Sequence, residues 1–214
     1  MVYTAVYGYK DNLKEPPAGI EADFVCFTDN PKVVSDYYRV VHVPAMSVTD
    51  NRISSRIFKM YPHLFLKEYK YTVWIDASIL IKSKDFLTFL KKEIGENEAL
   101  FVKHPDRKSL KQERNFCTKI GWDSEEYIMT QGLFYEEQGF KDIMGLVASG
   151  LMVRRNNPLK VHEFNEDWFD NLQSFARRDQ LSIMYLLWKH NIKFKALNLN
   201  LEKNKYFKLM PPNQ

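Results

Sequence analysis

Asp76 holds the position in this sequence that most favours chemistry. It directly follows an apolar run at residues 71–75, and the small residues Ala77 and Ser78 come next. In open α/β sheets, ligands bind outside the carboxyl ends of the strands. A carboxylate at such a place can bind a ribose hydroxyl or a divalent cation that bridges phosphates. The alternative is a turn aspartate that accepts a hydrogen bond from its own backbone.

Other candidate contacts also come at the ends of predicted strands. Asp29 and His104 each follow a short apolar run of the kind that is buried in a parallel sheet. Tyr7 lies near the end of the first predicted strand, where its ring could stack on a base or a sugar. We therefore expect these side chains to lie near Asp76 at one edge of the sheet.

A basic stripe is the second feature with chemical potential. Arg52, Arg56 and Lys59 share one face of a predicted helix that starts at Arg52, with Asp50 or Asn51 as its cap. Guanidinium groups match the geometry of phosphate oxygens, so this face could hold a pyrophosphate. The alternative is an ordinary solvated helix face.

The third feature is the run Arg178-Asp179-Gln180, which we expect to open a helix that reaches about His190. Asp179 could simply cap that helix. Gln180 would then point from the first turn, where free N–H groups and the positive end of the dipole favour anions and hydroxyl-rich ligands. The sequence leaves both readings open.

Several kinds of enzyme site are excluded by their missing motifs. The five histidines have no zinc-site spacing; His104 and His190 could each contact a metal ion or a phosphate, with a structural role as the alternative. The chain has no P-loop, no G-x-G-x-x-G and no G-x-S-x-G motif. Cys26 and Cys117 are far apart, so they indicate buried thiols in a reducing compartment.

The composition is that of one globular domain. The chain has 214 residues, 45% of them hydrophobic, with 31 basic and 27 acidic side chains and a net charge of +4. A general nucleic-acid binder would concentrate more positive charge. We therefore expect no nucleic-acid partner, while a local basic patch could still hold a phosphorylated small molecule.

We expect a cytoplasmic protein whose membrane contact is at most peripheral, at the inner face of a membrane. No apolar run approaches the roughly 20 residues of a membrane span, and the first residues lack the basic region and cleavage site of a signal peptide. The basic and aromatic tail at 201–214 is the segment that could touch a membrane surface, and we expect it to be loosely ordered.

Strands alternate with helices along the chain, which predicts an α/β layered fold. The predicted strands lie at residues 3–7, 24–27, 38–43, 71–75, 99–102, 150–153 and 193–197, with an extended segment at 79–81. The predicted helices begin at Arg52, at 86, within 107–137, at 161 and at 178.

A series of short motifs, in order, resembles one known family. The motifs are YTAVYGYKD (3–11), LKEP (13–16), VCFTDN (25–30), RISSRIFK (52–59) with PH (62–63), WIDASI (74–79), HPxR (104–107) and RDQLS (178–182). Together they resemble the glycosyltransferase-like family long known as domain of unknown function 616, found in bacterial polysaccharide loci and plant Golgi proteins. The resemblance covers about residues 1–190.

The resemblance implies a GT-A nucleotide-sugar fold with a mostly parallel sheet, in a single domain at 1–200 followed by the tail. The pattern is also similar, more distantly, to retaining family 8 enzymes such as glycogenin. Those enzymes carry an Asp-x-Asp after a strand, a small residue before Gly on another strand, and an Asp-Gln at a helix start. Asp76, Ser149-Gly150 and Asp179-Gln180 follow that order here.

What the resemblance implies about function is transfer of a sugar from a nucleoside diphosphate donor, with a UDP-sugar favoured, to a saccharide or lipid-linked saccharide. Arg178, Asp179 and Gln180 would be the catalytic residues. The implied donor-binding residues are Tyr7, Asp29, Arg52, Arg56, Lys59, Asp76, Ser78, His104 and Gly150. The implied reaction is metal-assisted and retaining, with inversion by Asp179 as base left as the alternative.

One departure from the family pattern concerns the metal. Ser78 stands where Asp-x-Asp has its second acid, and serine is a weaker ligand for Mn²⁺ or Mg²⁺. Either Asp76, with Ser78 as a weak ligand, binds the cation together with His104 or His190 and the donor phosphates, or the basic residues replace it. Ser78 also keeps open a second function, a non-catalytic nucleotide-sugar or saccharide-binding module.

Overall fold

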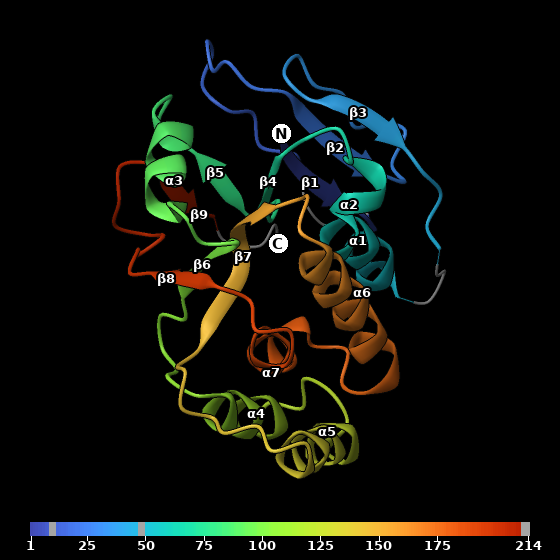
Figure 1. Ribbon diagram of the computed structural model, residues 1–214. Helices are drawn as coiled ribbons and strands as arrows, with labels where there is room; N and C mark the ends of the chain where they lie inside the picture. Colours follow the sequence, from blue (N-terminus) through green and yellow to red (C-terminus); the bar gives the residue numbers. More distant parts are fainter. Residues whose placement is uncertain (9–11, 47–49, 211–214) are drawn as a thin grey trace.

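A seven-stranded sheet runs through the computed structural model, which describes residues 1–8, 12–46 and 50–210 (Figure 1). The strands in spatial order are β3 (Arg39–His42), β2 (Phe24–Thr28), β1 (Val2–Val6), β4 (Tyr71–Ile75), β7 (Val147–Arg155), β6 (Ala99–Lys103) and β8 (Phe194–Leu197). Only β7 is antiparallel to its neighbours in this sheet. The predicted fold class, a mostly parallel sheet flanked by helices, is confirmed.

The order of the strands creates a switch point between β1 and β4. The chain moves outward from β1 to β2 and β3, and then returns to the other side of β1 as β4. Loops that leave two neighbouring parallel strands in opposite directions open a crevice between them, which is where ligands bind in such sheets. The ends of β1 and β4 are therefore the place to look for a site.

Alternating side chains bury both faces of the sheet. On β1, Tyr3 and Ala5 belong to one hydrophobic cluster, and Val2 and Val6 belong to another. The first cluster includes side chains of α1 (Asn51–Met60), α6 (Leu159–Ser174) and α7 (Ile183–Lys189), and the second includes those of α3 (Phe86–Ile94) (Figure 1). Burial on both sides explains the continuous apolar runs of the sequence.

Among the described residues, the further α-helices are α2 (Pro62–Phe65), α4 (Leu110–Lys119) and α5 (Glu125–Glu137). In Figure 1, α4 and α5 lie beyond α7, away from the sheet. No helix in the described ranges is long and apolar enough to cross a bilayer. Motif residues 9–11 and the prolines at 211 and 212 fall outside the described residues.

Two predicted boundaries are wrong. Strand β7 is nine residues long and begins at Val147 rather than Gly150. Val147 and Ala148 pair with Lys103 and Val102 of β6, and the register then shifts at Ser149, a small residue with little strand propensity. The continuous helix expected from residue 178 is a short 3-10 turn, η1 (Asp179–Leu181), followed by α7.

The prediction that the tail is loosely ordered is also wrong for residues 201–210, the part of it that the structure describes. Strand β9 (Phe207–Leu209) pairs antiparallel with β5 (Ile79–Ile81) in a second, two-stranded sheet. The side chain of Phe207 is fully buried and its ring meets the edge of Phe86 on α3. Pairing with the segment that follows Asp76 is a long-range contact that local sequence does not indicate.

We expect Phe207→Ala to lower the free energy of unfolding by about 3 kcal/mol, because it leaves a cavity between β9 and α3. Lys208→Ala, at the neighbouring exposed position, should change it by less than about 0.5 kcal/mol. Urea unfolding followed by circular dichroism measures both. Equal stabilities of the two variants would show that β9 contributes nothing to the fold.

Candidate functional site

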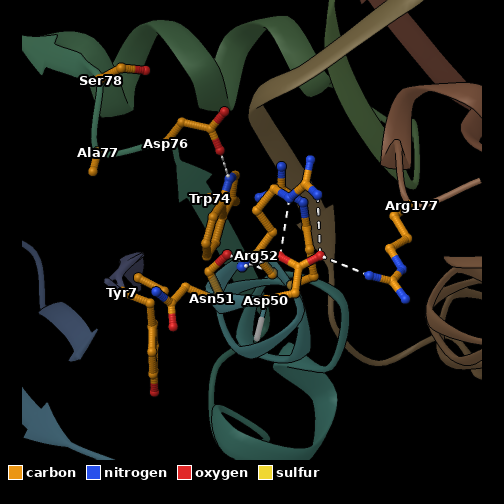
Figure 2. A pocket seen from close by; sticks show the side chains of 12 residues that line it. Tyr7, Asp50, Asn51, Arg52, Trp74, Asp76, Ala77, Ser78 and Arg177 are labelled. Carbon is orange, nitrogen blue, oxygen red and sulfur yellow. Dashed lines mark hydrogen bonds and ion pairs between the residues drawn. The ribbon is translucent and has the colours of Figure 1, made fainter. Parts of the chain in front are cut away.

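The crevice between β1 and β4 opens into a cavity of about 640 Å³. Its walls come from the end of β1, the start of α1, the end of β4 and the loop before η1. Figure 2 shows these side chains. The lining residues are Ala5, Tyr7, Asp50, Asn51, Arg52, Ser55, Arg56, Trp74, Asp76, Ala77, Ser78 and Arg177.

One end of this cavity is aromatic. The ring of Tyr7 lies parallel to that of Phe58, with centroids 6.0 Å apart, and its hydroxyl donates to the carbonyl of Val43 at 3.2 Å. Burial is the main cause that raises the pKa of the Tyr7 phenol, so the group stays neutral. Tyr7 is thus a fixed, uncharged ring at the cavity wall, as a contact for a base or a sugar requires.

Two guanidinium groups at the cavity wall are oriented by one carboxylate. Asp50 caps α1 by accepting from the N–H of Arg52 at 3.0 Å, and it also pairs with the Arg52 side chain at 3.1 Å. The Nη1 atom of Arg177 lies 3.5 Å from the other carboxylate oxygen (Figure 2). Burial alone would raise the pKa of Asp50, but the hydrogen bonds and charges of the two arginines lower it. Asp50 therefore stays ionised and keeps both cations at the cavity.

Asp76 lies between this cavity and a second one. Its Oδ1 atom accepts a 2.6 Å hydrogen bond from Trp74 Nε1 and lies 3.7 Å from Lys59 Nζ. A Cβ atom added to Gly150 would lie 3.0 Å from Oδ2, so the glycine leaves room for the carboxylate. Asp76 is therefore an oriented carboxylate, and not merely a turn residue.

The second cavity, of about 270 Å³, shares Arg56, Asp76 and Ser78 with the first. At its base the Oδ2 atom of Asp179 receives Lys59 Nζ at 2.7 Å, Arg56 Nε at 3.1 Å and the hydroxyl of Ser149 at 3.1 Å. No described residue donates a hydrogen bond to Oδ1. Two cations and a carboxylate from distant segments thus form the base of the smaller cavity.

The charges in this group are unusual because they are buried. Lys59 and Asp179 have side chains only 1% and 4% exposed. Burial would raise the pKa of Asp179, but Arg56, Lys59 and Arg178 overcome it and hold that pKa far below its usual range. Burial lowers the pKa of Lys59, against the attraction of Asp179 and Asp76. Mutual neutralisation therefore keeps the pair ionised.

This geometry decides the alternatives that the sequence left open for the basic stripe and for Asp179. Lys59 does not belong to a solvated face, since it lies beneath the cavity between Trp74 and Trp168, about 6 Å from each ring. Asp179 is not a cap, because neither η1 nor α7 has a side-chain cap hydrogen bond. The argument from a helix N-terminus at Gln180 also fails, because η1 has only three residues.

Gln180 and Arg178 still line the smaller cavity. The amide of Gln180 donates to the carbonyl of Val147 on β7. Arg178 is held by Glu113 of α4, with Nη2 3.4 Å from Oε1, and Glu113 is fully buried. The sequence predicted helical structure within 107–137, the segment that contains Glu113, but it gave no sign that this side chain reaches the site.

Not every predicted residue joins the site. His190 pairs with Asp167 at 2.8 Å, at the end of α7 opposite η1, and lines neither cavity. Asp29 also lines neither cavity; its carboxylate accepts from the N–H of Gly8 at 3.3 Å. It therefore supports the loop after β1, beside Tyr7.

His104 does line the smaller cavity, but its Nδ1 atom already accepts hydrogen bonds. Nδ1 accepts from the backbone N–H groups of Asp106 and Arg107, and Nε2 lies 2.9 Å from Arg107 Nη2. Burial, followed by the charge of Arg107, lowers the pKa of His104. The ring is therefore a neutral, fixed wall.

These facts bear on whether a divalent cation fits. Asp76 and Ser78 are the expected ligands, but Oδ1 of Asp76 already accepts from Trp74 and faces the Lys59 ammonium. Within residues 1–8, 12–46 and 50–210, no group of three or more His, Cys, Asp and Glu side chains could hold a metal ion. Mg²⁺ is commonly bound by one or two carboxylates together with waters and substrate phosphates, so the described residues offer a cation only Asp76 and Ser78, and Lys59 competes for Asp76.

Several lining residues were not predicted as site residues from the sequence, among them Asn51, Arg177 and Ser149. Arg177 directly precedes the predicted run at 178–180, and Ser149 precedes Gly150. Their position next to a predicted motif could have indicated them, but it does not indicate which neighbouring side chain points into the cavity.

Comparison with known proteins adds the family level. The model of a family described as TOD1/MUCI70, glycosyltransferase-like domain, matches residues 25–211. Among the similar solved structures is the apo form of WbbM, a bifunctional glycosyltransferase, with 12% identity and a TM-score of 0.52 over 92% of this chain. The chain covers 38% of that structure's chain, and at this identity the likeness shows a shared fold. No curated protein matches the chain.

Proposed function

The chain belongs to the TOD1/MUCI70 glycosyltransferase-like domain family, and from this premise we propose that it transfers a sugar from a nucleoside diphosphate donor to a saccharide acceptor. One observation carries the proposal: the large cavity at the switch point continues into a smaller one around Asp179, through the shared Arg56, Asp76 and Ser78. A nucleotide sugar has the same two parts, joined by a diphosphate.

We place the nucleoside in the larger cavity. Tyr7 and Ala5 offer a flat, mostly apolar surface for the base, and Asp76 can accept from a ribose hydroxyl. The diphosphate then lies against Arg52, Arg56 and Arg177, whose forked donors suit phosphate oxygens. We propose a UDP-sugar, which the resemblance favours, as the donor held in this arrangement.

The donor sugar then occupies the smaller cavity, among Gly150, Arg178, Asp179 and Gln180. As the bond to the diphosphate breaks, negative charge grows on the leaving group and positive charge grows on the sugar. The arginines stabilise the first, and the ionised Asp179, with Oδ1 unused by described residues, can stabilise the second. Retention of the anomeric configuration is our expectation, and NMR of the product's anomeric proton distinguishes it from inversion.

Neutralisation of the diphosphate by arginines leads to a prediction about metal. The divalent cation implied by the resemblance stays a prediction. Because few described side chains could bind it, we expect the arginines to neutralise the diphosphate in its place. We expect the affinity for UDP-sugars, measured by calorimetry, to change less than about twofold between EDTA and manganese, a difference under about 0.5 kcal/mol. Arg52→Ala with Arg177→Ala should weaken it at least tenfold in both buffers.

A matched control for this prediction is Arg114→Ala, which removes an arginine that pairs with Glu136 and lines neither cavity. Its donor affinity should equal that of the unmodified protein. Binding that appears only with manganese would show instead that a cation carries the diphosphate. A thermal-shift screen of nucleoside diphosphate sugars, run in both buffers, identifies the nucleotide.

The second candidate function, a non-catalytic binding module, rests on Ser78 in place of an acid. It shares the donor site and differs in turnover. Calorimetry would then detect donor binding, while chromatography would detect neither transfer nor slow hydrolysis of the donor. Release of nucleoside diphosphate by the unmodified protein, lost in an Asp179 variant, decides for the transferase.

A further inference from the structure

A cluster of two arginines and two aromatic rings stands next to the smaller cavity, and its aromatic rings have no role in the donor site. Arg107 and Arg178 line that cavity, and both pair with the buried Glu113 of α4. The guanidinium of Arg107 lies 4.1 Å from the ring centre of Phe116, and that of Arg178 lies 4.4 Å from the ring centre of Trp122. We call Phe116 and Trp122 the aromatic pair.

The aromatic pair is exposed although its surroundings are fixed. Phe116 is 38% and Trp122 is 44% exposed. The backbone N–H of Trp122 donates to the carbonyl of Cys117 at 2.9 Å. Between them, Gly121 has the left-handed backbone conformation that commonly follows the end of a helix, here α4. Next to it, Asp123 accepts from the N–H of Arg177 at 2.6 Å. The chain thus holds a tryptophan rigidly at the surface, between two segments of the site.

The position of the aromatic pair suits an acceptor rather than a donor. Neither ring belongs to the lining of either donor cavity, yet each touches a guanidinium that does. An acceptor must come next to the donor sugar in the smaller cavity, and Arg107 and Arg178 connect the lining of that cavity to the two exposed rings. Rigid aromatic rings offer area at low entropic cost to the CH face of a pyranose, and the guanidinium N–H groups can donate to its hydroxyls.

We propose that Phe116 and Trp122, with Arg107 and Arg178, bind the saccharide acceptor beside the donor-sugar cavity. This assignment rests on the proposed function for the identity of the acceptor, but saccharide binding itself does not require catalysis. Glu113 is then a positioning residue, because it orients both guanidinium groups and does not itself line the cavity.

The test uses an array of defined oligosaccharides and the full chain. Trp122→Ala should reduce binding to the retained saccharides at least tenfold, and Trp122→Phe should keep most of it. The control is Trp188→Ala, which removes a tryptophan of α7 that has a similar exposure, 39%, and packs against Tyr185 and Phe140. The donor affinity of Trp122→Phe and Trp188→Ala should stay within twofold of that of the unmodified protein, and thermal unfolding confirms that all three variants are folded.

The outcomes separate this inference from the proposed function. If Trp122→Ala binds the same saccharides as the unmodified protein, or if the unmodified protein binds none, the inference is wrong. Binding to vesicles of phosphatidylglycerol that is lost in Trp122→Ala, without saccharide binding, would assign the aromatic pair to a lipid surface and overturn it. Saccharide binding that depends on Trp122 in a protein that binds no nucleotide sugar would retain the inference and reject the transferase.

Discussion

Asp179→Ala is expected to lower the free energy of unfolding by about 3–5 kcal/mol and to abolish sugar transfer. The substitution removes the carboxylate that lies 2.7 Å from the ammonium of Lys59, which is 1% exposed, and leaves it only the partly exposed Asp76 at 3.7 Å. A poorly compensated buried charge is among the costliest single defects in a protein core. Asp179 also faces the proposed donor sugar, so the same substitution removes the group that stabilises the reacting centre. Urea unfolding and donor turnover measure the two effects.

A double substitution separates stability from catalysis. In Lys59→Met with Asp179→Asn, no unpaired buried charge is left, so we expect most of the lost stability to return. Turnover should stay at least about a thousandfold below that of the unmodified protein, because the carboxylate is still missing. If the double variant is stable and transfers sugar normally, Asp179 is a structural residue only.

Asp76→Asn is expected to weaken donor binding by about 10- to 100-fold with almost no change in stability. The carboxylate is about one-third exposed, and an amide of the same shape can still accept from Trp74 Nε1. What the amide lacks is the charge that strengthens a hydrogen bond to a ribose hydroxyl, worth about 1.5–3 kcal/mol. Calorimetric titration with UDP-sugar and thermal unfolding give the two quantities.

The control for Asp76 is Asp85→Asn. Asp85 is an exposed aspartate before α3, and its side chain makes no cap hydrogen bond there. Its donor affinity should therefore equal that of the unmodified protein. If Asp76→Asn and Asp85→Asn bind the donor equally well, the ribose contact assigned to Asp76 is refuted.

The fold and most candidate residues could be predicted because they depend on local pattern. Apolar runs that end in polar residues mark buried strands and their ends, so the strand at 71–75 and Asp76 after it follow from a few adjacent residues. Helical spacing also placed Arg52, Arg56 and Lys59 on one face of α1. The family resemblance agreed with this reading. The cytoplasmic location stays a prediction.

Other predictions failed where a distant segment decided the outcome. The tail at 207–209 is ordered by β5, more than a hundred residues earlier. His190 was a candidate ligand by residue type, but Asp167 of α6 holds it away from Asp76. Glu113 reads as a polar helix residue, and only its pairing with Arg107 and Arg178 brings it to the site.

By itself, the sequence determined which side chains share a strand end or a helix face, because these relations span only a few residues along the chain. Only the tertiary structure decided that Lys59 and Asp179, 120 residues apart, form a buried ion pair beneath the cavity instead of a solvated face and a helix cap. The physical reason is that periodicity specifies a face but not what packs against it. Burial and the resulting ion pairs arise from that packing.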